Sequence, residues 1–321
     1  IEANQMNRTG DLPAIRKILV EAEKQPGCED PRVRCRAQSI LALNIYFGSP
    51  GKGLKAAREA VRAGRKTSDN ELLLHALNRL ILVLHYQGRL NLEEGRRALV
   101  EAESRLGTCG DLILKFYIRL NHAVWHLETG ELSKAELAFK KVEKVIRGSK
   151  AEEAKGMLHL NLGELALSLR DYERAEREYH LAESLFRPSS PPYFQRICDA
   201  GIGECALFKG DLREARRRES KIPSLPSFWS YDPSVIVAFK AKMLAKRGSQ
   251  PEALKLLAEV RKAVRGRLVP AWIRISLEEW RLSRRSTTTP DTEVVQAALR
   301  SASRLLLKER TRELERCVEE T

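Results

Sequence analysis

The feature that most constrains the fold of this chain is an internal repeat of about 40 residues. Apolar stretches with helical spacing end at turn-forming residues, here called turn markers, which lie 38, 40, 42, 40, 40 and 38 residues apart. The markers are six glycines and one arginine, namely Gly10, Gly48, Gly88, Gly130, Arg170, Gly210 and Gly248. Small residues form two further columns around the last four markers, at Ala135, Ala175, Ala215 and Ala253 and at Ala123, Gly163, Gly203 and Ala241. A fixed period of this kind indicates a repeat architecture.

The best-defined unit predicts an antiparallel helix pair. Residues 155–169 and 173–186 each carry an apolar stripe with helical spacing, and a short turn around Arg170 joins them. The small residues at Gly163 and Ala175 predict a close approach of the two helices. A glycine marker suits a helix end that needs a left-handed residue, so we expect the turn at Arg170 to be strained or differently built.

The whole chain is therefore predicted to be all-α, a right-handed solenoid of about seven antiparallel helix pairs. No stretch alternates like a strand, and a single helix pair cannot bury its apolar face without neighbours. We expect one array over residues 1–321, with an irregular break at 219–235 and a terminal helix at 290–320. Three prolines interrupt the break, and its aromatic residues fit either a binding patch or a plug over a shortened helix: Phe228, Trp229 and Tyr231.

The pattern resembles the tetratricopeptide repeat (TPR) family. Leu162-Gly163, Tyr172, Ala175 and Tyr179 carry the resemblance, although the period is near 40 rather than the family's 34. Longer repeats of this kind resemble those of large bacterial signal-transduction ATPase regulators of the maltose-regulon activator type. The resemblance implies an array that senses an effector or partner between a nucleotide-binding and a DNA-binding domain. Because the chain starts at Ile1 rather than Met, we expect it to be part of a larger protein.

Motifs for catalysis, cofactors or metals are missing from the sequence. It has no P-loop, no dinucleotide-binding glycine motif, no H-E-x-x-H and no nucleophile elbow, so we expect no enzyme, no catalytic residue and no cofactor. His122 and His126 are four residues apart, but two ligands do not make a metal site. The cysteines are expected to be small buried residues in a reducing, cytoplasmic compartment, and no apolar run is long enough for a membrane span.

The concave face of a solenoid is its usual functional surface, and the resemblance implies that the first helix of each pair lines it. In the family, asparagines and basic residues there clamp a peptide or its terminal carboxylate. The resemblance therefore nominates six groove residues for a peptide, a partner domain or a small-molecule effector: Asn78, Arg79, Arg119, Asn121, Asn161 and Glu164. The alternative is that these are solvated polar residues on helix faces.

The charge balance supports a second class of partner. The chain has Lys+Arg 57 against Asp+Glu 43, a net charge of +14, and its basic clusters could bind nucleic acid. Aromatic residues that could stack on bases are only 6% of the chain, and many arginines alternate with glutamates. The sequence thus predicts a protein-binding or effector-binding module of a larger bacterial regulator. A basic nucleic-acid binder and a passive assembly scaffold are the alternatives.

Overall fold

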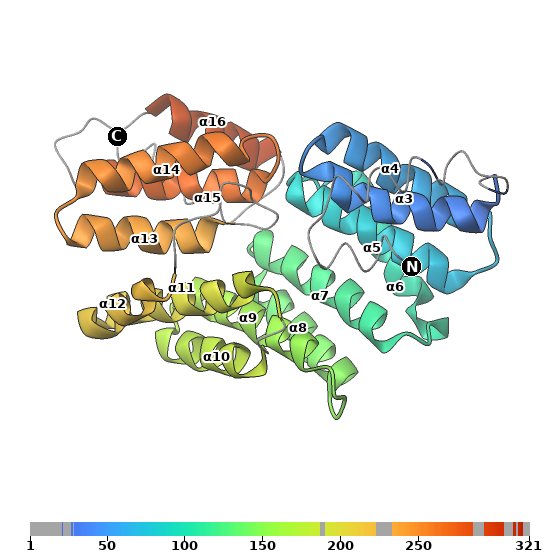
Figure 1. Cartoon of the computed structure of the whole chain (residues 1–321), viewed down its shortest axis with the longest axis horizontal. Coiled ribbons are helices and arrows are strands. Elements are labelled where there is room, and N and C mark those ends of the chain that lie inside the picture. Colours follow the sequence, from blue (N-terminus) through green and yellow to red (C-terminus); the bar gives the residue numbers. More distant parts are fainter. Residues whose placement is uncertain are drawn as a thin grey trace. The chain divides into compact units, whose positions relative to one another are not determined.

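In a computed structural model of the chain, the described residues are 21, 27, 29–186, 190–222, 233–284, 292–304, 311–312 and 314–316. Every regular element among these residues is helical (Figure 1). Seven helix pairs follow one another: α3 (Pro31–Tyr46) and α4 (Pro50–Gly64), α5 (Asn70–Tyr86) and α6 (Glu93–Arg105), α7 (Leu112–Glu128) and α8 (Leu132–Ile146), α9 (Glu152–Ser168) and α10 (Tyr172–Leu185), α11 (Pro192–Lys209) and α12 (Leu212–Ser220), α13 (Ser234–Lys246) and α14 (Gln250–Val264), α15 (Val269–Ser283) and α16 (Thr292–Arg304). None of them has the length and apolar character that a membrane span requires.

The chain divides into two compact units, Ile1–Asn121 and His122–Thr321. In the first unit α3 packs on α4 and α5, and α5 packs on α6. In the second unit α9 packs on α10 and α11, α11 on α12 and α13, and α13 on α14 and α15. First helices therefore contact the first helices of neighbouring pairs, as expected when pairs stack to share a core. This confirms the all-α fold of stacked helix pairs, while the single array over 1–321 and its right-handed sense stay predictions.

The turns between paired helices follow one design. At Gly88, Gly130, Gly210 and Gly248 the backbone is left-handed, with φ between 67° and 83°. At each of these turns the residue after the marker donates its backbone N–H to the carbonyl five residues earlier, which satisfies an otherwise free helix end. Gly48 is the exception to the prediction, because its φ is not positive.

Arg170 has the same geometry as the glycines, with φ at 60°. The N–H of Asp171 donates to the Ala166 carbonyl at 2.9 Å, as at the other turns. The turn is therefore built like its neighbours and is strained only because a residue with a Cβ occupies it.

Glycines open space for aromatic rings between helices, as the small-residue columns predict. The ring of Tyr179 lies between Gly163 and Gly201, where an added Cβ would stand 2.9 Å and 2.5 Å from the Tyr179 Cζ. Phe239 packs in the same way over Gly203. The six alanines of these columns are fully buried: Ala123, Ala135, Ala175, Ala215, Ala241 and Ala253.

The predicted break is visible in the length of α12. It has 9 residues, whereas α10 has 14 and α14 has 15. Glu219 occupies the column that holds Phe139 and Tyr179 in earlier units, and it pairs with Arg247 instead of filling a core. The aromatic residues of the break and Pro290, the first residue of the predicted terminal helix, lie outside the described residues: Phe228, Trp229, Tyr231 and Pro290.

Candidate ligand-binding groove

The six nominated residues all lie on first helices. Asn78 and Arg79 are on α5, and Arg119 and Asn121 are on α7, within the first unit. The remaining two, Asn161 and Glu164, are on α9 in the second unit.

Asn78 and Asn121 join α5 to α7. The Nδ2 of Asn121 donates to the Oδ1 of Asn78 at 2.8 Å, and the Asn78 side chain is buried. A buried amide that is hydrogen-bonded across two helices fixes their register. The pair therefore holds the backbone next to Arg79 in place.

Arg79 is a half-buried cation on α5. Its side chain is half-buried, and the structure shows no hydrogen bond or ion pair between it and any described residue. Desolvation lowers the pKa of Arg79, and the groups that act in the opposite direction are the phenols of Tyr86 and Tyr117 rather than a carboxylate. A guanidinium stays charged at any physiological pH, so Arg79 is a partly desolvated cation with no counter-charge among the described residues.

The surroundings of Arg79 are aromatic. Tyr86 stacks on Tyr46 at 5.7 Å between ring centroids, and Phe47 lies 5.6 Å from Tyr86. One turn before Arg79, the His75 Nε2 is 3.8 Å from the Asp111 carboxylate, and burial lowers the pKa of His75. This face of the first unit therefore offers a fixed cation beside aromatic rings.

Arg119 is separate from this face. Residues two apart on a helix do not share a face, so Arg119 and Asn121 point in different directions. The residues equivalent to Arg119 in the next two units contact second helices, since His159 pairs with Glu178 at 2.7 Å and Asp199 pairs with Arg218 at 2.9 Å. The nomination of Arg119 as a groove residue is therefore not supported by its place on α7.

In the second unit both nominated residues are already engaged. Asn161 donates from Nδ2 to the Met157 carbonyl of its own helix at 2.7 Å. Glu164 accepts from Arg274 on α15 at 3.3 Å. The polar groups of Asn161 and Glu164, which the sequence nominates for ligand binding, therefore already bind other parts of the chain.

Sequence analysis missed the charged pairs that join the first helices of the second unit. Lys242 on α13 pairs with Glu204 on α11 and lies 3.6 Å from Glu278 on α15. Glu164 and Glu204 each follow the glycine of a small-residue column, and Lys242 follows the equivalent Ala241. Charged residues directly after the small residue of each first helix could have predicted these pairs, because that position faces the same side of every first helix.

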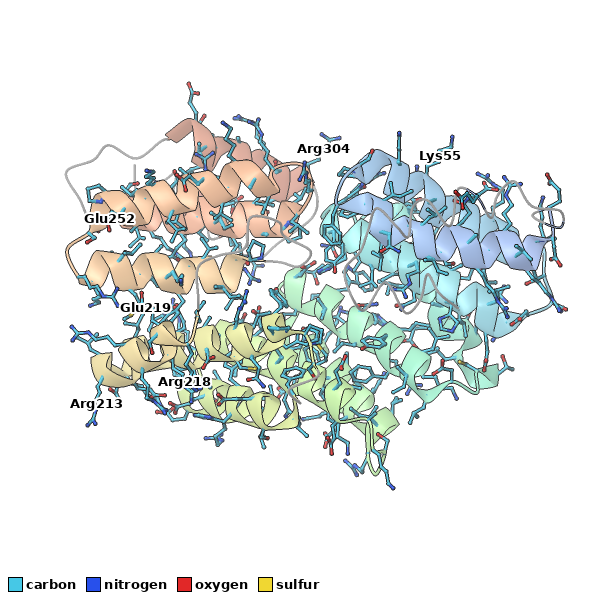
Figure 2. All side chains as sticks on the ribbon, viewed as in Figure 1. Lys55, Arg213, Arg218, Glu219, Glu252 and Arg304 are labelled. Atoms are coloured by element: carbon cyan, nitrogen blue, oxygen red, sulfur yellow. The ribbon has the colours of Figure 1, made fainter. Side chains whose placement is uncertain are left out.

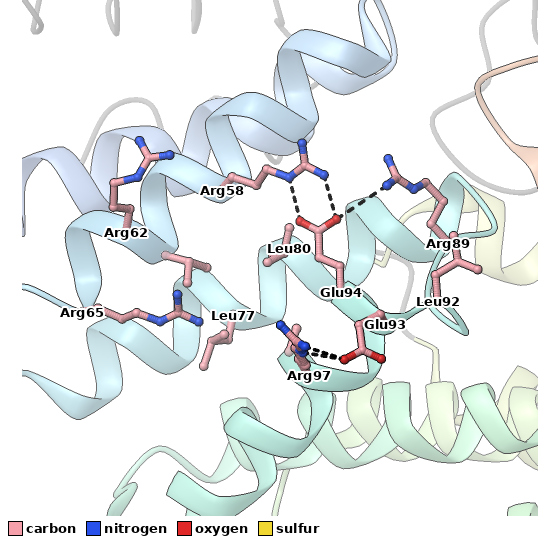
Figure 3. A pocket seen from close by; sticks show the side chains of 12 residues that line it. Arg58, Arg62, Arg65, Leu77, Leu80, Arg89, Leu92, Glu93, Glu94 and Arg97 are labelled. Carbon is pink, nitrogen blue, oxygen red and sulfur yellow. Dashed lines mark hydrogen bonds and ion pairs between the residues drawn. The ribbon is translucent and has the colours of Figure 1, made fainter.

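A second surface of the first unit is a pocket of about 600 Å³ lined by five arginines (Figure 3). The carboxylate of Glu94 accepts two hydrogen bonds from Arg58, at 2.6 Å and 2.7 Å. Figure 3 also shows Arg97 paired with Glu93. Because carboxylates neutralise its guanidiniums, this pocket is a weaker anion site than its arginine content suggests: Arg58, Arg62, Arg65, Arg89 and Arg97.

The two histidines considered for a metal have other contacts. The rings of His122 and His126 stack at 4.9 Å, and the His126 Nδ1 is 3.0 Å from the Glu131 carboxylate. Burial lowers the pKa of His126, whereas its hydrogen bond to Glu131 acts in the opposite direction. No group of three or more potential metal ligands occurs among the described residues.

The cysteines that the structure describes are buried and free, as predicted: Cys35, Cys109, Cys198 and Cys205. Burial raises the pKa of Cys205 to about 12. Such thiols carry almost no thiolate at neutral pH and behave as small apolar residues. Cys28 and Cys317 lie outside the described residues.

Comparisons with known proteins support the fold. No family model matches the chain, and no curated protein matches it by sequence. Among solved structures, the apo form of RapI is 13% identical, covers 99% of this chain and 97% of its own, and has a TM-score of 0.59. BtubC from P. vanneervenii is 16% identical over 67% of this chain and 92% of its own, with a TM-score of 0.52.

The fold is TPR-like. It consists of helix pairs that repeat about every 40 residues, with small residues where the helices pack together. The structural match to RapI covers nearly the whole chain. A signal-transduction ATPase (STAND) protein with a tetratricopeptide repeat sensor, PH0952 from Pyrococcus horikoshii, is more distant. It is 14% identical and has a TM-score of 0.48, with 95% of this chain and 50% of that one covered.

Proposed function

We propose that this chain is a protein-binding or effector-binding TPR-like module of a larger bacterial regulator, and that the face around Arg79 binds an acidic group of its partner. The single observation that carries the proposal is a half-buried arginine without an acidic partner among the described residues. The TPR-like fold supports an interaction module in general. The regulatory context follows from the sequence resemblance.

The energetics of arginine burial favour a ligand at this position. Removing a charged group from water is costly unless an opposite charge compensates it. Two other half-buried arginines have such partners, since Arg174 pairs with Glu136 at 3.0 Å and Arg261 with Glu279 at 2.6 Å. At Arg79 the missing carboxylate would come from the partner, because a guanidinium binds a carboxylate through two parallel hydrogen bonds.

The rest of the face would favour a peptide. Asn78 and Asn121 hold α5 and α7 together beside the cation, and Tyr86 extends an aromatic surface along α5. Amides and aromatic rings are well suited to the backbone and apolar side chains of an extended segment. A small carboxylate effector is the alternative occupant of the same site.

Binding of a fluorescein-labelled hexaglutamate peptide tests the proposal. We expect Arg79→Gln to weaken binding about tenfold or more, since a hydrogen bond to a charged group contributes about 1.5–3 kcal/mol. The matched control is Arg97→Gln, which removes an exposed arginine that is already paired with Glu93. Equal binding by the wild-type chain and Arg79→Gln would contradict the assignment.

Stability separates a ligand-binding arginine from a structural one. Removing an uncompensated buried charge should leave the denaturation midpoint unchanged or raise it. We therefore expect Arg79→Gln to be at least as stable as the wild-type chain in urea. A structural arginine would give the opposite result, because its loss would leave partners unpaired.

Nucleic-acid binding is the second candidate function, and the exposed Arg213 and Arg216 favour it. In the same cluster Arg217 and Arg218 are engaged by Glu214, which reduces the charge available to phosphates. A salt titration with generic duplex DNA distinguishes the two, because phosphate contacts weaken steeply with salt and would not depend on Arg79. The buried free thiols favour a reducing compartment, so the cytoplasm is the proposed location.

A further inference from the structure

One ion pair in the second unit joins helices that are three pairs apart. The Arg274 Nη2 on α15 lies 3.3 Å from the Glu164 Oε2 on α9, and the two residues are 110 positions apart in sequence. Their side chains are 27% and 21% exposed, so water reaches both. The contact therefore spans the first-helix face of this unit from one side to the other.

Nothing comparable joins these helices elsewhere in the described part of the chain. There α9 packs on α8, α10 and α11, and α15 packs on α13, α14 and α16, but α9 and α15 share no packed interface. By contrast, the pairs of Lys242 with Glu204 and Glu278 connect helices that already pack together. The Glu164–Arg274 pair is thus a contact between two helices that have no packed interface.

A buried hydroxyl lies on α10, which packs on α9. The Tyr179 ring passes between Gly163 on α9 and Gly201 on α11, and its hydroxyl has no hydrogen-bond partner in the structure. The ring end that carries the hydroxyl lies against Gly163, the residue before Glu164, and burial, followed by the charges of Glu164 and Arg274 among others, acts on the pKa of Tyr179. A buried unpaired hydroxyl costs free energy that water or a ligand atom would recover once the face opens.

We propose that Glu164 and Arg274 form an electrostatic latch that closes the first-helix face of the second unit. The closed state keeps the ion pair and leaves the Tyr179 hydroxyl unsatisfied, whereas the open state loses the pair and hydrates the hydroxyl. The two contributions oppose each other, which is what a switch between two states requires. A partner that offers a carboxylate to Arg274 would favour the open state. This latch is independent of the Arg79 face.

The latch has a defined dependence on salt. An ion pair that water reaches on both sides is weakened by ionic strengths near 1 M, whereas apolar packing between neighbouring helices is not. Raising the NaCl concentration should therefore separate α9 from α15 and leave α11, α13 and α15 packed together. The distance between α9 and α15 can therefore be compared with the distance between α11 and α13 in one sample.

Zero-length cross-linking of the full chain measures that proximity. In an Arg274→Lys variant, a carbodiimide joins the new amine to the Glu164 carboxylate with loss of water, which the reagent takes up as a urea. The native Lys242–Glu204 pair reacts in the same sample and reports on neighbouring helices. We expect the α9–α15 cross-link to fall at least threefold between 20 mM and 1 M NaCl, relative to the Lys242–Glu204 cross-link, and to increase in a background that also carries Tyr179→Phe.

If the lysine of the Arg274→Lys variant is too short to reach Glu164, a double-mutant cycle on the native pair tests the latch instead. Glu164→Gln, Arg274→Gln and the double variant are unfolded in urea at both salt concentrations. We expect a coupling of about two- to fivefold in the unfolding equilibrium constant at 20 mM NaCl and none at 1 M. No coupling at low salt would overturn the latch, and a cross-link yield that is independent of salt would show a permanent staple instead.

Discussion

At the residue scale, Arg170 combines a left-handed backbone with a side chain that the other four left-handed turns of this type avoid. Its φ of 60° costs a residue with a Cβ about 1 kcal/mol relative to glycine. We predict that Arg170→Gly stabilises the chain by about 0.5–1 kcal/mol, measured as a shift of the urea midpoint at constant slope.

The control for Arg170→Gly is a glycine in a helix interior. Arg177 lies in the middle of α10 and is exposed, so Arg177→Gly should destabilise by about 1 kcal/mol. Opposite signs for the two substitutions would confirm that the backbone conformation, and not loss of an arginine, sets the effect. Destabilisation by Arg170→Gly would mean that its side chain makes a stabilising interaction.

Arginines that are neighbours in one basic cluster of the sequence differ in their exposure to solvent. Arg213 and Arg218 belong to one basic cluster on α12 (Figure 2), but only Arg213 is exposed. Arg218 is 3% exposed, and three carboxylates surround it, those of Glu183, Asp199 and Glu214 at 2.7–2.9 Å. Its guanidinium helps to lower the pKa of Glu214 to about 2. Counting arginines therefore overstates the basic surface of this cluster.

At the element scale, the closeness of α11 and α13 depends on Gly203. Alanine favours a helix by up to about 1 kcal/mol over glycine, but a Cβ at this position would overlap the Phe239 ring. Forcing extra atoms into a packed core costs about 1–3 kcal/mol, so we predict that Gly203→Ala lowers the free energy of unfolding by about 1–2 kcal/mol. Thermal or urea unfolding measures the change.

Two variants test the steric origin of that loss. Phe239→Leu should reduce the cost of Gly203→Ala, because the smaller side chain leaves room for the methyl group. Gly51→Ala on α4 is the matched control, since a Cβ there meets nothing within 4 Å and should be neutral or stabilising. If Gly51→Ala and Gly203→Ala have the same effect, helix propensity rather than packing governs both.

The elements show which features could be predicted from sequence. The turns and the small-residue columns depend on local chemistry repeated at a fixed spacing, so Gly163 and Gly203 identify the close helix approaches. The short α12 follows from Glu219 in an apolar column. The Glu164–Arg274 pair could not be predicted, because a contact across 110 residues depends on how successive pairs are rotated. Arg119 lies two residues from Asn121 and therefore on another helix face, which the helical period alone predicts.

At the scale of the whole molecule, ion pairs connect neighbouring helix pairs at nearly one repeat. Within each unit, such pairs add an electrostatic contribution to the interface between adjacent repeats. Partners are separated by 36, 36, 38, 35 and 38 residues in Arg58–Glu94, Arg65–Glu101, Arg174–Glu136, Arg218–Glu183 and Lys242–Glu204. The stability of the array should therefore depend on the ionisation of its carboxylates.

Acid should destabilise the chain in two steps. Burial lowers the pKa of His75 and His126, so the unfolded chain binds protons first as the pH falls through about 6.5, and stability decreases. Ion pairing lowers the pKa of Glu94, and of Glu131 and Glu214 to about 2. Their contribution is complete above the unfolded pKa near 4.5 and is lost as the pH falls towards 2.

The melting temperature, followed by circular dichroism between pH 8 and pH 3, checks this pH dependence. We expect a shallow decrease from pH 7 to 5.5 and a steeper one below pH 4.5. His126→Gln should reduce the first decrease, since it removes one of the histidines, and should reduce the second by a smaller amount, since Lys134 and then His126 hold the pKa of Glu131 low. A melting temperature that rises between pH 7 and 5.5 would mean that protonated histidines are stabilised in the fold, which their burial opposes.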